Sequence, residues 1–282
     1  MIDSHVVLRI AKDKAFKLLI IICSGLMIVP LLLILYYIIR NGIAVIHWDF
    51  LFSLPRPIGE DGGGIANALV GTAMLIISAS AIALPFGVFA GVYLAENRGS
   101  RISDAVRLCV EILQGVPSIV IGIIAYEWLV VSMGSFSALS GGVALAIMML
   151  PVVVRSTEET LKMIPDTIRE ASLALGVSYT RTVLKVIMPA GLSGILTGSL
   201  IGIARIAGET APLLFTAFGS PFMNTNIFKP VDSLPHIIFN YATSPYPTWH
   251  AKAWGAALVL VIMVLGFNIS AKIVTRRWKV QF

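Results

Sequence analysis

Two charged residues lie close together in a long apolar stretch of the chain. Arg205 and Glu209 are four residues apart, and the residues around them are apolar, small or hydroxylated. On a helix, residues with this spacing are neighbours on one face, so the two side chains could contact each other directly. A guanidinium group can hold an oxyanion through two parallel hydrogen bonds, and a nearby carboxylate could neutralise it when no anion is bound. The spacing therefore predicts either part of an anion pathway or a structural ion pair.

A stripe of glycines precedes this pair on the same predicted helix. The stripe consists of Gly191, Gly194, Gly198 and Gly202. At about 3.6 residues per turn, the glycines and both charged residues fall on one face. Small residues let a second helix approach closely, so we expect this face to meet protein. Because the glycines alone would suffice for packing, and one arginine at mid-membrane costs at least about 2.5–3.5 kcal/mol, we favour a pathway role for Arg205 and Glu209.

The composition indicates an all-α, polytopic membrane protein. The chain has 282 residues, of which 57% are hydrophobic and only 13% charged, and its mean hydropathy is +0.89. A soluble domain carries about 25% charged residues, and a membrane-spanning helix needs about 20 mostly apolar residues. Pro85 interrupts the second predicted span, and Gly115-Val116-Pro117 interrupts the third. Six transmembrane helices are predicted, at residues 16–39, 65–95, 106–131, 139–154, 183–208 and 254–274.

The basic residues predict the orientation of these spans. Most lysines and arginines lie in the N-terminal tail, after the second and fourth spans, and at the C-terminal end. These four segments share one side of a six-span topology, so the positive-inside rule places both termini in the cytoplasm. Topology thus explains the formal net charge of +6. A nucleic-acid role would need a basic soluble face with interleaved aromatic residues, and the sequence shows none.

The spans divide the chain into three regions. Residues 1–64 hold the N-terminal tail, the first span and an outer loop, and residues 276–282 form a cytoplasmic tail. The transmembrane domain, residues 65–275, holds five core helices and a cytoplasmic loop at residues 165–189. Its outer segment, residues 210–252, is rich in proline but also apolar. We expect this outer segment to fold back onto the bundle as short helices and turns.

The cytoplasmic loop contains signals for a short helix. Pro165 and Asp166 form a favourable helix start, and Gly176 suits a helix end. These signals predict an amphipathic helix over residues 166–175. Amphipathicity alone would indicate no more than an ordinary helix at the membrane interface.

The remaining titratable residues predict no catalytic or metal site. Glu111 follows Arg107 by four residues, a spacing typical of an ion pair within one helix. The four histidines lack the spacing of metal ligands. The chain has no Gly-Lys pair and hence no G-x-x-x-x-G-K nucleotide loop. We therefore expect neither a cofactor nor enzymatic activity in this chain.

The spacing within the cytoplasmic loop resembles the EAA loop of ABC importer permeases. That pattern is E-A-A, three residues, glycine, nine residues and I-x-L-P, and here it reads Glu170-Ala171-Ser172, Gly176 and Val186-Ile187-Met188-Pro189. Ser172, Val186 and Met188 are conservative departures from it. The resemblance implies a coupling helix that docks on a separate ATPase through Glu170, Ala171 and Gly176. ATP and Mg²⁺ would then be bound by that partner.

Other stretches resemble the permeases of phosphate ABC importers. They are GVPSIVIGI, ARIAGETAPLLFTAFG, SLPHIIFNYATSP and AWGAALVL, and with the EAA-like loop they cover roughly residues 65–275. The resemblance implies a type I importer (MetI-like) bundle in a bacterial inner membrane. It also implies a second permease subunit (PstC-like), an ATPase dimer (PstB-like) and an external phosphate-binding protein (PstS-like). Phosphate specificity depends on this resemblance, because an arginine by itself would serve sulfate or molybdate equally well.

Two other classes of protein stay open from the residues alone. An ion-coupled carrier or a passive anion channel could use Arg205 as its selectivity charge, and a membrane scaffold for a signalling complex could use the pair structurally. The EAA-like loop distinguishes them from an importer permease, because a carrier or a channel needs no helix that docks on an ATPase.

Overall fold

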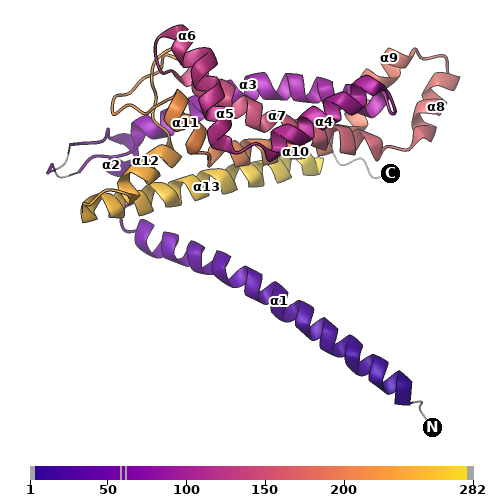
Figure 1. Cartoon of the computed structure of the whole chain (residues 1–282), viewed down its shortest axis with the longest axis horizontal. Helices are drawn as coiled ribbons and strands as arrows, with labels where there is room; N and C mark the ends of the chain where they lie inside the picture. The colour runs from indigo at the N-terminus through magenta and orange to yellow at the C-terminus, as the bar shows by residue number, and fades with distance from the viewer. Residues whose placement is uncertain (1–3, 58, 61, 278–282) are drawn as a thin grey trace.

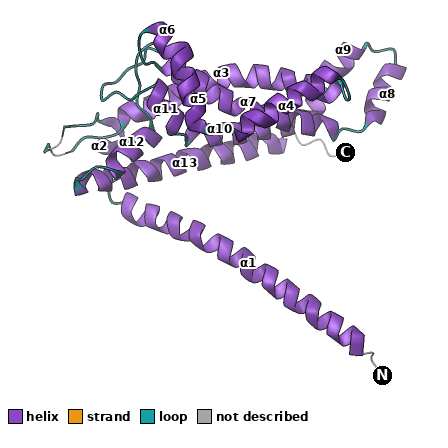
Figure 2. Cartoon of the chain, in the orientation of Figure 1, coloured by secondary structure: helices purple, strands orange, loops and turns teal. Residues whose placement is uncertain are grey.

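The described part of the chain is helical. The computed structural model describes residues 4–57, 59–60 and 62–277, and these residues form no β-strand, only an isolated bridge between Phe218 and Val231 (Figure 2). The all-α fold predicted from the sequence is confirmed. The elements are α1 Ser4–Gly42, α2 Trp48–Phe52, α3 Ala66–Glu96, α4 Arg101–Gly115, α5 Ser118–Ala125, η1 Tyr126–Val130, α6 Val131–Met133, α7 Ala138–Lys162, α8 Asp166–Ala174, α9 Tyr179–Thr182, η2 Val183–Ile187, α10 Met188–Ala207, α11 Ala211–Thr216, α12 Leu234–Ala242 and α13 Pro247–Arg277.

Among the described residues, five helical stretches are long and apolar enough to cross a membrane. They are α1, α3, α7, the stretch from α9 through α10, and α13. The remaining predicted span, the third, corresponds to α4 followed by the stretch from α5 through α6, Ser118–Met133, and the two parts are bent by 104°. Pro117 causes the break, because a residue before proline avoids helical geometry and Val116 is indeed extended. Six spans are thus obtained only when this bent pair counts as one.

Helices α3 and α7 pack against each other along the bundle. Gly87 and Gly91 of α3 face Val153, Val154 and Thr157 of α7, and a Cβ atom on Gly87 would lie 2.8 Å from Val153. Such small residues allow the helices to approach closely. The predicted interruption of this span is wrong, because α3 continues through Pro85 as one helix.

Helix α1 leaves the bundle at an angle and meets it only near its C-terminal end (Figure 1). There, Gly42 lies against Trp254 and Leu258 of α13. From Phe16 to Ile34, the apolar side chains of α1 are exposed. Of the predicted C-terminal tail, residues 276 and 277 belong to α13, while residues 278–282 lie outside the described part.

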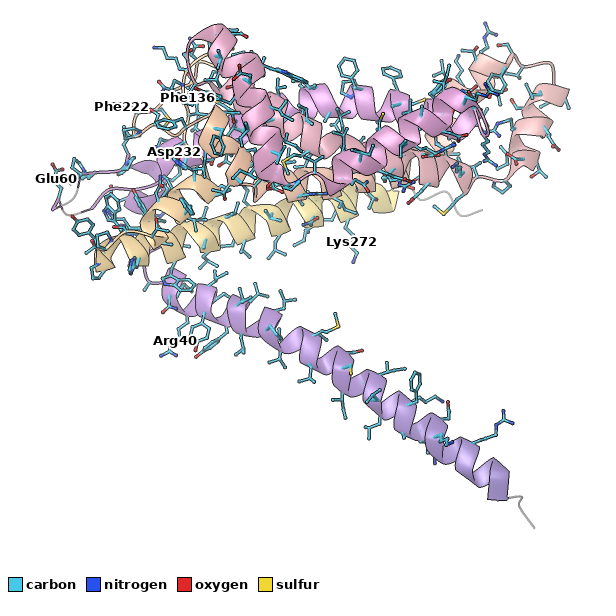
Figure 3. The ribbon with its side chains drawn as sticks, viewed as in Figure 1. Arg40, Glu60, Phe136, Phe222, Asp232 and Lys272 are labelled. Carbon is cyan, nitrogen blue, oxygen red and sulfur yellow. The ribbon has the colours of Figure 1, made fainter. Side chains whose placement is uncertain are left out.

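The proline-rich segment between α10 and α13 folds onto the end of the bundle opposite α8. Leu234 of α12 is fully buried, and its backbone N–H donates to the hydroxyl of Thr72 on α3 at 2.9 Å. Burial raises the pKa of Tyr241, also on α12, to about 12. Figure 3 shows Phe136, Phe222 and Asp232 gathered at this end. The segment is therefore part of the packed bundle.

Candidate functional site

The four glycines of the stripe lie on the side of α10 that faces α7. The two helices run antiparallel, so the glycines meet α7 residues in reverse order. Because no glycine carries a side chain, α7 side chains occupy the space directly beside the α10 backbone. The contacts are Gly191 with Leu161, Gly194 with Thr160, Gly198 with Ser156, and Gly202 with Met149.

Arg205 lies in the last turn of α10, and its side chain is exposed at the surface of the chain. Helix α10 ends at Ala207, so Glu209 lies beyond the helix, in the turn before α11, and is half-buried. The expectation that Arg205 and Glu209 share one helical face is wrong. Gly208 is the C-cap of α10, and a separate helix, α11, begins at Ala211 with Pro212 in its first turn. Within the described residues, no ion pair joins the two side chains.

A groove between α7 and α10, lined by apolar, hydroxyl and charged residues, extends from Ile201 of α10 to Met163 at the α8 end of α7. It consists of two adjoining hollows of about 350 Å³ and 300 Å³. Ile201 lines both hollows, and Arg205 is one turn further along α10. Hydroxyl groups can donate hydrogen bonds to an anion without adding charge. The hydroxyl residues that line the groove are Ser156, Thr160, Ser193 and Thr197.

A second arginine lines this groove. Arg155 of α7 shares the larger hollow with Gln114 and Glu159, and its guanidinium binds the carboxylate of Glu111 on α4 at 3.0 Å. The expected pairing of Glu111 with Arg107 is wrong, because Arg107 turns to other carboxylates. Sequence reasoning missed Arg155 as a groove residue because the predicted span ended at residue 154, whereas α7 continues to Lys162.

The EAA-like loop forms α8, Asp166–Ala174, close to the range that the sequence predicts. Gly176 ends the helix with a φ of +77°, and its N–H donates to the carbonyl of Leu173 at 2.9 Å. The N–H of Val177 donates to the carbonyl of Ser172 at 3.3 Å, which completes a Schellman motif. Glycine suits Gly176 because this left-handed conformation strains residues with a side chain.

The residues predicted to dock on an ATPase are exposed. Glu170, Ala171 and Gly176 all lie on the surface, and 84% of Leu175 is exposed beside them. No described atom lies within 4 Å of where a Cβ of Gly176 would be. These residues are therefore accessible to a partner protein.

Ser172, which replaces an alanine of the EAA pattern, has a structural role. Its hydroxyl is buried and lies 2.9 Å from the hydroxyl of Thr182 on α9. The departure from the pattern therefore adds a buried hydrogen bond that holds α8 against α9.

Residues 83–280, most of the chain, match the family described as "Binding-protein-dependent transport system inner membrane component". The chain belongs to this family. Among solved structures, this permease resembles the inward-facing MetNI methionine ABC transporter, with a TM-score of 0.64 and 23% identity over 77% of this chain and 96% of that chain. This likeness confirms the predicted MetI-like fold.

Curated relatives of this permease are much more similar in sequence. The phosphate transport system permease protein PstA of Yersinia pestis is 41% identical over 250 residues, which cover 88% of this chain and 85% of the relative. The probable phosphate transport system permease protein PstA of Methanocaldococcus jannaschii is 40% identical over 266 residues, which cover 94% of each chain. The similarity therefore extends over nearly the whole permease.

Proposed function

We propose that this permease is a membrane subunit of an ATP-driven phosphate importer. The observation that carries the proposal is its similarity to phosphate permeases over nearly its whole length, with 41% identity to the first of them. The exposed Arg205 supports it, because it lies one turn beyond a groove to which four hydroxyl residues contribute, and such a surface can bind and pass an oxyanion. The exposed α8 supports a transport cycle driven by a partner, since a carrier or channel needs no such helix.

Arg205 is the residue that attracts phosphate into the pathway. Its side chain points away from the chain's own core, so a second permease subunit facing it would close the groove into a conduit. A guanidinium binds phosphate through two hydrogen bonds, which makes it a suitable first station for the anion. Glu209 lies four residues after Arg205, in the turn between α10 and α11. Its negative charge limits how tightly the anion is held.

Beyond Arg205, phosphate passes along the groove between α7 and α10. The hydroxyl of Thr160 donates a hydrogen bond to it on the way, and the hydroxyls of Ser156 and Thr197 do so once they release the backbone carbonyls of Gly194 and Ser193. Arg155 adds positive charge, but Glu111 already neutralises that charge in part at 3.0 Å. A partly neutralised arginine binds an anion weakly enough to release it, as conduction through several sites requires.

The transport cycle is driven from the end of the bundle that carries α8. This end faces the cytoplasm, and both termini of the chain lie on the same side. Helix α8 docks on an ATPase subunit through Glu170, Ala171 and Gly176, while a phosphate-binding protein delivers the anion at the opposite end. ATP and Mg²⁺ are bound by the ATPase, and this chain has no hydrolytic role.

Reconstitution tests this function. We expect the complete complex of both permeases and the ATPase in proteoliposomes to take up phosphate only with its binding protein and ATP. Phosphate uptake by the permeases without the ATPase would indicate a carrier or channel instead. Uptake of sulfate or molybdate in preference to phosphate would contradict the proposed substrate.

A further inference from the structure

The end of α3 is joined to both helices of the EAA-like loop through one carboxylate. Glu96 is the last residue of α3, and only 6% of its side chain is exposed. It accepts a hydrogen bond from Nη2 of Arg169 on α8 at 2.6 Å and another from the Tyr179 hydroxyl on α9 at 2.5 Å. A single buried group thus holds α8 and α9 to a membrane-spanning helix.

Arg169 uses both ends of its guanidinium in this cluster. While Nη2 binds Glu96, Nη1 binds Asp166 in the first turn of α8 at 2.8 Å. A planar guanidinium can hold two carboxylates at once in fixed geometry, whereas a lysine ammonium cannot hold them in the same way. Arg98 also approaches Asp166, at 3.7 Å, but both of these side chains are largely exposed, so this pair adds little.

The same turn of α3 is also joined to α4 and α7. Nη2 of Arg107 on α4 donates to the backbone carbonyl of Leu94 at 3.1 Å, and its Nε binds Glu158 of α7 at 2.8 Å. Glu158 is buried and takes a second ion pair from Lys162 at 2.6 Å. The α8 end of α3 is therefore fixed on one side to the loop and on the other side to the packed bundle.

We propose that Glu96 is the positioning residue that transmits movement of α8 to α3 during transport. This inference rests on the proposed docking of α8 on an ATPase. Glu96 itself is buried, whereas Glu170, Ala171 and Gly176 are exposed, so Glu96 acts after docking and takes no part in it. A charged pair with so little exposure resists separation, because pulling it apart leaves an uncompensated buried charge.

The test compares phosphate uptake with ATP hydrolysis in the complete complex. The variant Glu96→Gln keeps the size of the side chain but removes its charge. We expect the ATPase to co-purify and hydrolyse ATP as before, while phosphate taken up per ATP falls about fivefold or more, as for loss of a typical coupling between sites. Asp13→Asn is the matched control, because it breaks an exposed ion pair with Lys17 outside the cluster and leaves uptake per ATP unchanged.

A double-mutant cycle shows whether Glu96 acts through Arg169. Arg169→Gln alone is expected to lower uptake per ATP as Glu96→Gln does, and the double variant is expected to lose no more than either single variant. Additive losses would mean that the two residues act separately and would overturn the proposal.

A distance measurement separates transmission from a merely structural role. Spin labels at Thr167 on α8 and Phe89 on α3, both exposed, report the distance between these helices once Cys23 and Cys109 are replaced by serine. We expect this distance to stay the same with and without ATP in the parent, and to change with ATP in Glu96→Gln. If the parent transports phosphate and the distance in Glu96→Gln stays the same with and without ATP, the proposal is wrong, whether or not uptake per ATP falls. If the parent neither transports phosphate nor binds an ATPase, the proposed function has failed instead.

Discussion

Gly198 of α10 lies so close to Ser156 of α7 that a Cβ atom on the glycine would overlap the serine side chain. We therefore expect Gly198→Ala to destabilise the permease by about 1–3 kcal/mol, the usual cost of overpacking. Thermal unfolding of the purified protein in detergent would measure the effect. Gly25→Ala in α1 is the matched control, since no described atom lies within 4 Å of its added Cβ and alanine favours the helix. Equal melting temperatures for the two variants would contradict this packing.

Replacing Arg205 tests the anion pathway. We expect Arg205→Gln to lower phosphate uptake by about ten- to a hundredfold, because it removes charge-assisted hydrogen bonds to the anion. Arg205→Lys keeps the positive charge but loses the planar guanidinium that makes two parallel hydrogen bonds. We therefore expect its phosphate uptake to lie between that of the parent and that of Arg205→Gln. Membrane insertion and ATPase binding stay normal, because Arg205 is exposed and makes no ion pair with Glu209. Full uptake by Arg205→Gln would exclude this residue from the pathway.

The pair between Arg155 and Glu111 tests how the anion leaves the groove. Glu111→Gln frees the guanidinium of Arg155, which is held at 3.0 Å in the parent. We expect the anion to bind more tightly and leave more slowly, so that both the KM and the maximal rate of phosphate uptake fall. Arg155→Gln makes the opposite change: it removes the positive charge that binds the anion, so we expect the KM for phosphate to rise. Unchanged kinetic constants in both variants would place this pair outside the pathway.

Helix periodicity depends only on spacing, so it places the four glycines on one side of α10, the side that meets α7 in the structure. The expected face is wrong about two turns after Gly202, at Glu209, because the helix end at Gly208 moves the next residues off that face. Periodicity gives the face of a residue only while the helix continues. The break at Pro117 is likewise visible in the sequence, whereas its angle of 104° depends on packing of α4 and α5 against the bundle.

The extent of α7 could not be predicted for a different reason. The charged residues after Val154 look like the start of a loop, yet α7 continues through Arg155 and Glu158 to Lys162. Buried Glu158 is tolerated within the helix because Arg107 and Lys162 both pair with it. These partners come from another helix and from the next turn, so local hydropathy cannot reveal that the charge is compensated.

Gly176 tests whether α8 docks on an ATPase. We expect Gly176→Leu to reduce co-purification of the ATPase or uptake per ATP severalfold. The space around Gly176 is open, so a leucine side chain would fit within the permease but would occupy the surface on which the ATPase docks. The positive φ of +77° adds strain of about 1–3 kcal/mol in any such variant. Gly134→Leu controls for strain, since Gly134 also has a positive φ of +67° and open space but lies between α6 and α7. Equal loss in both variants would attribute the effect to strain and contradict docking.

The buried hydroxyl pair tests the role of Ser172. Ser172→Ala restores the alanine of the EAA pattern but leaves the buried hydroxyl of Thr182 without its partner at 2.9 Å. We expect a loss of about 1–3 kcal/mol in stability, the cost of an unsatisfied buried polar group. Adding Thr182→Val removes the second hydroxyl as well, so the double variant should recover most of the stability. Thermal unfolding in detergent gives both values, and a double variant less stable than Ser172→Ala would show that the hydroxyl of Thr182 has another role.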